Sequence, residues 1–306
     1  MKIYEWNIHM SATIPSNNGY CLKPWVIEEI TKEGPDCFVL TEFVVSTGIE
    51  HYFEVMRKRG YHWFISSSTK TNGILIGLKE EPFDFKDTFD DYSKPSVLTE
   101  QILVDKYLDQ LLKNEKSIKE ELESLSVDLP DFYEVRVKWK DAPLSFIGVR
   151  IRKSQNKSDD SDFKTNQFRF LDNYLSGLAN NNQKYICIGD MNAYWRRRSG
   201  EDIWQKEANH TLNETAKRSV LLTPENDSSQ EQWSYVFDDN TKKTLDHMIT
   251  NLIDCSNDSD NKKIKSKDYD WGFINSLRYP AGITAGSSYK PAGLPDHAIL
   301  KVELDI

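Results

Sequence analysis

Short runs of apolar or alternating apolar and polar residues recur along the chain, and each is typical of a β-strand. The predicted strands cover Lys2–Ile8, Asp36–Leu40, His62–Ser66, Gly73–Leu78, Phe132–Trp139, Leu144–Ile151, Tyr185–Ile188, Trp233–Phe237, Thr244–Ile249 and Ala298–Leu304.

Between these strands, apolar positions at helical spacing predict helices over Leu22–Ile30, Ile49–Arg59, Phe163–Leu178 and a segment near Glu207–Leu221. A stretch rich in Leu, Lys and Glu, Ser96–Leu125, predicts one or two more helices within an insertion at about 84–130. The polar segments Lys153–Asp162 and Cys255–Lys267 are predicted to be loops.

Early in the chain the predicted strands and helices alternate, whereas the later strands lie close enough in sequence to pair antiparallel. This order suits an α/β protein of layered sheets with helices outside. The sequence contains no Pro-, Gly- or Ser-rich linker that would divide it. We therefore expect one domain over residues 1–306, interrupted by the helical insertion.

Composition narrows the functional class only slightly. The 306-residue chain is 38% hydrophobic, which predicts a globular protein, and its formal net charge of −9 argues against a nucleic-acid coat protein. Its four cysteines are scattered, as expected of buried reduced thiols. There is no signal-peptide pattern at the start and no long apolar run, so we expect a cytoplasmic protein without a membrane span. No protein partner is predicted.

The ends of several predicted strands carry polar side chains of a particular kind. The run I-C-I-G-D-M-N ends on Asp190 and Asn192, which share a face in extended geometry. Singly, each such end reads equally well as a cap, a turn or a solvated charge. Because strand ends meet at a sheet edge, their number favours a common site. The others are Asn7, Glu42, Asp246, Asp296 and His297.

The order W-N, then E after a second strand, then G-D-x-N, L-D and D-H resembles the endonuclease/exonuclease/phosphatase superfamily, which includes deoxyribonuclease-I-like and exonuclease-III-like enzymes. The resemblance runs from residue 6 to residue 297. It implies a four-layered α/β sandwich, in which two packed mixed β-sheets are flanked by helices. It also implies an enzyme that hydrolyses phosphate esters with Mg²⁺, for which Mn²⁺ can substitute.

The resemblance assigns metal binding to three of these residues. Glu42 resembles the principal metal ligand, Asn7 would orient a ligand or a metal-bound water, and Asp296 would lie at the metal or bracket the nucleophile. Carboxylates with adjacent waters suit Mg²⁺.

Four residues resemble the catalytic group of the same superfamily. Asp190 matches the residue that holds and deprotonates the attacking water, and Asn192 matches the amide that hydrogen-bonds a phosphoryl oxygen. His297 matches the histidine that binds the scissile phosphate, and Asp246 would fix the orientation of its imidazole.

One position departs from the pattern. Where many relatives carry His or Tyr, the strand F-I-G-V-R-I-R presents Arg150. Arginine binds phosphate with two prongs but does not give up its proton, so this residue suits a phosphate clamp better than a leaving-group acid. An ordinary strand-end arginine is the alternative. His9 stands where some relatives carry a second ligand, and an ordinary histidine is equally compatible with that place.

The substrate is left open by the sequence. Trp195 and the three arginines that follow it, Arg196, Arg197 and Arg198, could hold a nucleic-acid backbone and stack on a base, or form a solvated basic turn. A nuclease or phosphodiesterase is the main expectation. The alternatives are a phosphatase or phospholipase acting on a small phosphorylated molecule or lipid headgroup, and a non-catalytic binding protein.

Overall fold

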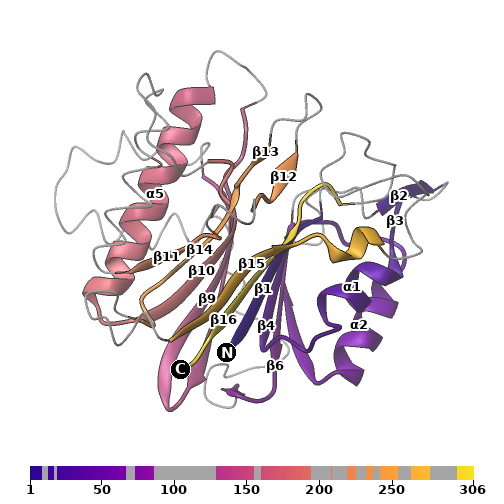
Figure 1. Ribbon diagram of the computed structural model, residues 1–306, viewed down its shortest axis with the longest axis horizontal. Coiled ribbons are helices and arrows are strands. Elements are labelled where there is room, and N and C mark those ends of the chain that lie inside the picture. The colour runs from indigo at the N-terminus through magenta and orange to yellow at the C-terminus, as the bar shows by residue number, and fades with distance from the viewer. Residues whose placement is uncertain are drawn as a thin grey trace.

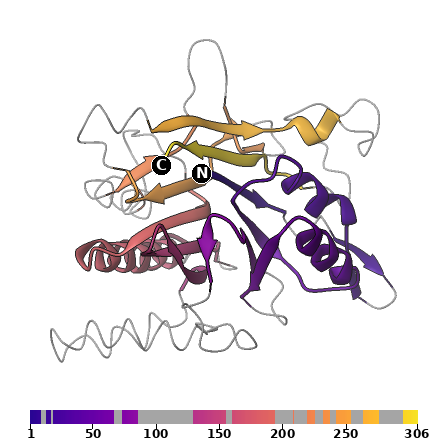
Figure 2. The ribbon, with the colours of Figure 1, turned by 90° about the horizontal axis from the view of Figure 1, so that it is seen from below.

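A computed structural model of the protein describes residues 1–8, 13–16, 19–66, 73–85, 129–154, 160–193, 208, 219–224, 232–236, 242–253, 263–275 and 295–306. The described part of the chain is built around two six-stranded sheets (Figures 1 and 2). The predicted helical insertion at about 84–130 lies almost entirely outside the described residues.

The first sheet has the strand order β15-β16-β1-β4-β6-β5. Only β1 and β4 are parallel neighbours in it, and the other pairs are antiparallel. Its strands are β1 (Lys2–Asn7), β4 (Cys37–Phe43), β5 (Tyr61–Ile65), β6 (Gly73–Lys79), β15 (Ile264–Asp270) and β16 (Ile299–Leu304).

The second sheet has the order β11-β14-β10-β9-β8-β7, with β9 and β10 parallel. Its strands are β7 (Phe83–Asp84), β8 (Asp131–Trp139), β9 (Ala142–Arg150), β10 (Lys184–Asp190), β11 (Val220–Leu222) and β14 (Asp246–Thr250). Two short hairpins stand apart from both sheets. They are β2 (Thr13–Ser16) with β3 (Gly19–Leu22), and β12 (Tyr235–Val236) with β13 (Lys242–Lys243).

Helices cover the outer faces of the sheets. Figures 1 and 2 show α1 (Pro24–Ile30) and α2 (Ile49–Lys58) together on one side and α5 (Asp160–Asn180) on the other. A short 3₁₀ helix, η2 (Gly272–Asn275), follows β15. None of the helices in the described part of the chain is both long and apolar enough to cross a membrane.

Three apolar clusters fill the spaces between these layers. One lies between the two sheets and contains Ile3, Ile188 and Met248. A second joins the first sheet to α1 and α2, and a third joins the second sheet to α5. The order of layers is therefore helix, sheet, sheet, helix, which confirms the four-layered α/β sandwich.

Strand alternation decides which side chains reach the space between the sheets. Ile3 lies in the inter-sheet cluster and Tyr4 in the outer one, so Glu5 and Asn7 fall on the inner face. In β10 the same rule follows from Ile188 and places Asp190 on the inner face. The polar strand ends thus meet between the sheets.

Two predicted loops were wrong at their C-terminal ends. The predicted loop Cys255–Lys267 runs into strand β15, a polar edge strand whose charged pattern carries no alternation signal. The predicted helix near Glu207–Leu221 lies almost entirely outside the described residues, and only its last two positions are found in strand β11. Helix α5 begins at Asp160, inside the predicted loop Lys153–Asp162, and the β2–β3 hairpin was not predicted.

The glycine of the G-D-M-N run is required by close packing of two strands. A β-carbon added to Gly189 would lie 1.8 Å from the carbonyl oxygen of Val149 in the neighbouring strand β9. Any larger residue must therefore push β9 and β10 apart, next to Asp190.

We expect Gly189→Ala to lower the free energy of unfolding by about 3 kcal/mol or more, because it overpacks a strand pair that cannot separate cheaply. Gly60→Ala is the matched control. Gly60 has a φ of 72° but nothing within 4 Å of an added β-carbon, so only its backbone strain of about 1 kcal/mol applies. Urea unfolding of both variants tests this, and equal losses would contradict it.

Candidate active site

Strand register lines up four ionisable residues across the second sheet. Asp131 of β8 pairs with Arg150 of β9, Arg150 pairs with Asp190 of β10, and Asp190 pairs with Asp246 of β14. Opposite charges therefore stand next to each other on three of the four strands, a favourable cross-strand arrangement. The row runs along the sheet end that faces β1 and β4.

The first sheet contributes Asn7 and Glu42 to the same space. Asn7 ends β1 and is almost fully buried. Strict alternation would point Glu42 outward, since Leu40 faces α1 and α2. A register irregularity between Leu40 and Phe43, together with a φ of 54° at Glu42, turns its side chain inward instead. A bulge that re-aims one side chain in this way is common beside active sites.

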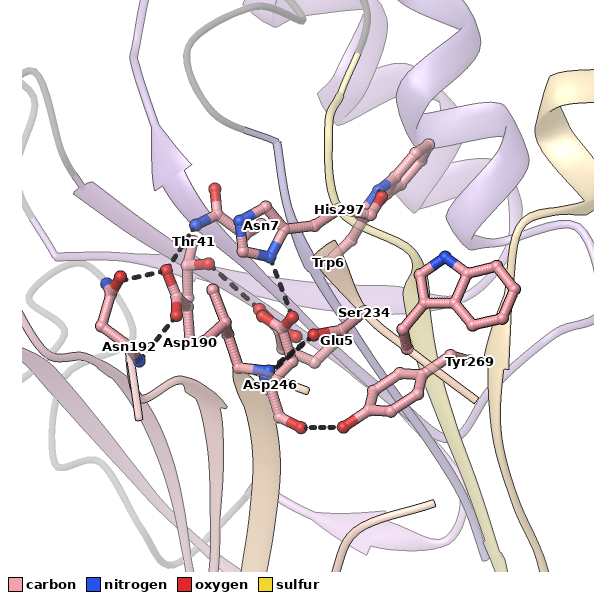
Figure 3. Close-up of polar contacts among 12 residues, drawn as sticks. Glu5, Trp6, Asn7, Thr41, Asp190, Asn192, Ser234, Asp246, Tyr269 and His297 are labelled. Atoms are coloured by element: carbon pink, nitrogen blue, oxygen red, sulfur yellow. Dashed lines mark hydrogen bonds and ion pairs between the residues drawn. The ribbon is translucent and has the colours of Figure 1, made fainter. Parts of the chain in front are cut away.

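Asp190 lies at the centre of the group, held by amide donors (Figure 3). Its Oδ2 accepts hydrogen bonds from Asn7 Nδ2 at 2.9 Å and from Asn192 Nδ2 at 3.0 Å, and its Oδ1 accepts one from the Asn192 backbone N–H at 2.8 Å. Asn192 Nδ2 also donates to the Ile151 carbonyl at 2.7 Å. Both amide hydrogens of Asn192 are thus engaged within the protein, so its side chain orients Asp190.

The surroundings of Asp190 tune its basicity. Burial raises the pKa of its carboxyl to about 6, against the lowering effects of the His297 and Arg150 charges. A carboxylate with this pKa is ionised near neutrality and still accepts a proton readily, which suits a general base.

His297 and Asp246 form a buried ion pair. His297 Nδ1 lies 2.8 Å from Asp246 Oδ2, and Tyr235 packs against the imidazole with ring centroids 4.7 Å apart. Burial lowers the pKa of His297, but the Asp246 charge and hydrogen bond outweigh it and raise the pKa to about 10. The ring is therefore a cation at neutral pH. Among the described residues Nε2 makes no hydrogen bond, which leaves it able to bind an anion.

Several residues that the sequence did not single out hold this pair in place. Trp6 Nε1 donates to the His297 carbonyl at 2.9 Å. The hydroxyl of Ser234 accepts hydrogen bonds from the backbone N–H groups of Leu245 and Asp246, and the Tyr269 hydroxyl donates to the Asp246 carbonyl. Trp6 belongs to the W-N motif, whereas Ser234 and Tyr269 reach the pair from distant parts of the chain and belong to no motif.

Arg150 bridges the two sheets. Its Nη2 lies 2.7 Å from Glu42 Oε1 and its Nη1 lies 3.0 Å from Asp131 Oδ2, with the side chain 14% exposed. Asp131 was not predicted. Arg150 was expected at a strand end, and the strand register places Arg150 between Asp131 and Asp190.

Glu5 is the most unusual of the residues that sequence reasoning missed. It is fully buried, and Thr41 Oγ1 donates to its Oε1 at 3.0 Å. Burial and the Asp246 charge raise its pKa well above the ordinary value, while the His297 charge opposes this. Within the described part of the chain, neither Glu5 Oε2 nor Asp246 Oδ1 has a hydrogen-bond partner. The two carboxyl groups appear together in Figure 3.

The carboxylate oxygens of Glu42 are of the kind that Mg²⁺ binds, but one of them is already paired with Arg150. Mg²⁺ is usually held by one or two carboxylates, its own waters and substrate phosphates, and Glu42 with the neighbouring Asn7 offers such a beginning. No three His, Cys, Asp or Glu side chains in the described ranges form a group that could hold a metal ion. Glu42 Oε1 is paired with Arg150, so an incoming cation would compete with the guanidinium for this carboxylate.

Asp296, the third predicted metal ligand, is 7% exposed and raises the pKa of the adjacent His297 through its charge. The predicted substrate residues Trp195, Arg196, Arg197 and Arg198 lie outside the described residues, as does His9. The structure therefore brings together Asn7, Glu42, Arg150, Asp190, Asn192, Asp246 and His297, with Asp296 beside them.

Comparison with solved structures finds several proteins with a similar fold. An AP endonuclease from Archaeoglobus fulgidus has a TM-score of 0.58 and 13% identity, and each chain covers all of the other. The 3'-5' exonuclease NExo from Neisseria meningitidis has a TM-score of 0.55 and 12% identity, also over both full chains. D. rerio TDP2 complexed with a single-strand DNA product has a TM-score of 0.53 and 13% identity, over 100% of this chain and 99% of that one.

Scans of protein-family models and of curated protein sequences find no match to the chain. The structural neighbours belong to the endonuclease/exonuclease/phosphatase superfamily. At these identities the likeness establishes the fold, and it confirms the fold that the motif order implied.

We expect Glu5→Gln to stabilise the protein at neutral pH, because the amide removes a buried acid whose pKa the fold raises. An acid of this kind contributes stability below its ordinary pKa and loses that contribution as pH rises. The gain should therefore be absent at acidic pH and increase as the pH rises. Urea unfolding should show wild type and variant converging at acidic pH and diverging as pH rises. A constant difference would contradict the assignment.

Proposed function

We propose that this chain, a protein with the endonuclease/exonuclease/phosphatase fold, is a divalent-metal-dependent phosphodiesterase that acts on nucleic acid. The observation that carries the proposal is the placement of Asp190. A buried carboxylate with a pKa of about 6 is held by three amide hydrogen bonds, and it lies in one site with two cationic side chains, His297 and Arg150. A general base beside two cationic side chains suits the attack of water on a phosphate ester, because the cations can bind the phosphoryl oxygens.

In the proposed reaction a water molecule attacks phosphorus while Asp190 takes its proton. Asn7 and Asn192 keep the carboxylate oriented through their amide groups. The new bond joins the water oxygen to phosphorus. The bond from phosphorus to the leaving oxygen breaks, and that oxygen departs with the electron pair and takes a proton from solvent water. Preorganised donors of this kind need no rearrangement as charge develops.

The cationic groups would bind the phosphoryl oxygens. His297, kept protonated by Asp246, presents Nε2, and Arg150 presents its remaining N–H groups. Arg150 does not act as the acid for the leaving group, because a guanidinium does not release its proton. A bound Mg²⁺, held by Glu42 with Asn7 beside it, would neutralise negative charge on the phosphate.

The choice of nucleic acid rests on the structural neighbours. TDP2 from D. rerio is described with a single-strand DNA product, and NExo with a product DNA hairpin. The same NExo structure is described as a 3' phosphatase, so a terminal phosphate on a nucleic acid belongs among the substrates to test.

A substrate panel with Mg²⁺ or Mn²⁺ tests the proposal. The panel contains plasmid DNA, single strands, abasic duplex, RNA, inositol phosphates and sphingomyelin. We expect cleavage of a nucleic acid that a chelator abolishes and added metal restores. Turnover confined to inositol phosphates or sphingomyelin would favour the small-molecule or lipid alternative. Full turnover in excess chelator would exclude the metal.

On the substrate so identified, we expect Asp190→Asn to lower kcat by about 10²–10⁴-fold, the usual contribution of a general base. Glu54→Gln is the matched control, since Glu54 is an exposed acid of α2 that pairs with Lys58, and its kcat should equal that of wild type. Near-normal turnover by Asp190→Asn would remove this residue from the mechanism.

The pH dependence provides an independent check on the base. Asp190 works only when ionised, and its pKa is about 6, so kcat/KM should fall as pH drops through about 6. His297, with a pKa of about 10, should remain protonated throughout the acidic and neutral range. A flat acidic limb in wild type would argue against Asp190 as the base.

A further inference from the structure

Glu42 has two competing functions in this site. The resemblance assigns it to metal binding, yet its Oε1 lies 2.7 Å from Arg150 Nη2, the distance of a strong charge-assisted hydrogen bond. The bulge that turns Glu42 inward aims it at this guanidinium. A divalent cation bound to this carboxylate would repel a guanidinium held at that distance, so the two cations compete for Glu42.

Arg150 has a second ion-pair partner, so its guanidinium can leave Glu42 and still be held in the site. Its Nη1 is anchored 3.0 Å from Asp131 Oδ2 in the neighbouring strand, and β8 and β9 pair at these two residues. The Arg150 Nε is buried without a hydrogen-bond partner among the described residues. The guanidinium therefore has one firm anchor, one bond to Glu42 and unused donors.

We propose that Arg150 and the divalent metal alternate at Glu42, so that metal binding releases Arg150 to bind the phosphate of the substrate. This inference rests on the proposed function and adds a linkage to it. While the Arg150–Glu42 pair is formed, it opposes the binding of a cation at this carboxylate. When a divalent cation takes Glu42, Arg150 pivots on Asp131 and directs its freed donors to a phosphoryl oxygen.

Two consequences follow for binding. The metal has to break the Arg150–Glu42 pair, so its affinity for wild type is lower than Glu42 alone would give. Phosphate that draws Arg150 away also vacates Glu42, and coupling between two ligands is reciprocal. Metal and phosphate should therefore strengthen each other's binding, with part of the effect passing through Arg150.

Calorimetric titration with Mn²⁺ alone, without substrate or turnover, tests the competition. We expect Arg150→Met to bind Mn²⁺ about tenfold more tightly than wild type, the factor that corresponds to about 1.4 kcal/mol. Arg152→Met is the matched control, because Arg152 carries the same charge and approaches the same Asp131, at 3.9 Å. It should change the Mn²⁺ affinity less than about twofold if the effect is specific to Glu42.

A second arm adds inorganic phosphate. Phosphate should tighten Mn²⁺ binding in wild type, and the gain should be smaller in Arg150→Met. Glu42→Gln should remove Mn²⁺ binding in both the wild-type and the Arg150→Met backgrounds. If Arg150→Met does not fold, Arg150→Gln replaces it, and the rise in thermal unfolding midpoint with Mn²⁺ reports affinity in either variant.

Equal or weaker Mn²⁺ binding by Arg150→Met would overturn the competition, as would an equal gain in Arg152→Met. These results leave the proposed function standing, because metal-dependent cleavage is measured separately. Absence of Mn²⁺ binding in every variant would overturn the competition, and absence of metal-dependent cleavage would overturn the proposed function.

Discussion

Burial of negative charge between two sheets is the constraint on which the rest of this structure depends. Carboxyl groups that are buried or nearly so meet there, and they belong to Glu5, Glu42, Asp131, Asp190, Asp246 and Asp296. Two cations, Arg150 and His297, lie among them. An unpaired buried charge is costly, so each carboxylate needs a cation, a hydrogen-bond donor or a proton.

The local irregularities of the fold serve this arrangement. The bulge at Glu42 turns an outward position inward, towards Arg150. Gly189 lets β10 approach β9 closely enough to set Asp190 beside Arg150 in register. The pKa of Asp190, raised to about 6 by burial, and the pKa of His297, raised by Asp246, are consequences of one crowded space. The raised basicity of Asp190 and the positive charge of His297 therefore arise from the same packing.

Sequence pattern predicted the sandwich and the strand ends because both depend on local periodicity and motif order. Asn7, Asp190, Asp246 and His297 end or begin strands that the apolar runs already marked. The inward turn of Glu42 could not be predicted, since simple alternation points it the other way. Asp131 and Glu5 could not be predicted from the sequence. Asp131 becomes a neighbour of Arg150 only through strand pairing, and Glu5 becomes a neighbour of Asp246 only through sheet packing.

We propose that these strand ends form a single site that binds a phosphate ester and takes a divalent cation at Glu42. Crystals of the protein grown with Mn²⁺ and inorganic phosphate test it most directly through anomalous diffraction at the manganese edge. We predict manganese beside Glu42, phosphate between His297 and Asp190, and Arg150 turned from Glu42 towards the phosphate. Manganese bound elsewhere, with the Arg150–Glu42 pair intact, would rule out a cation site at Glu42.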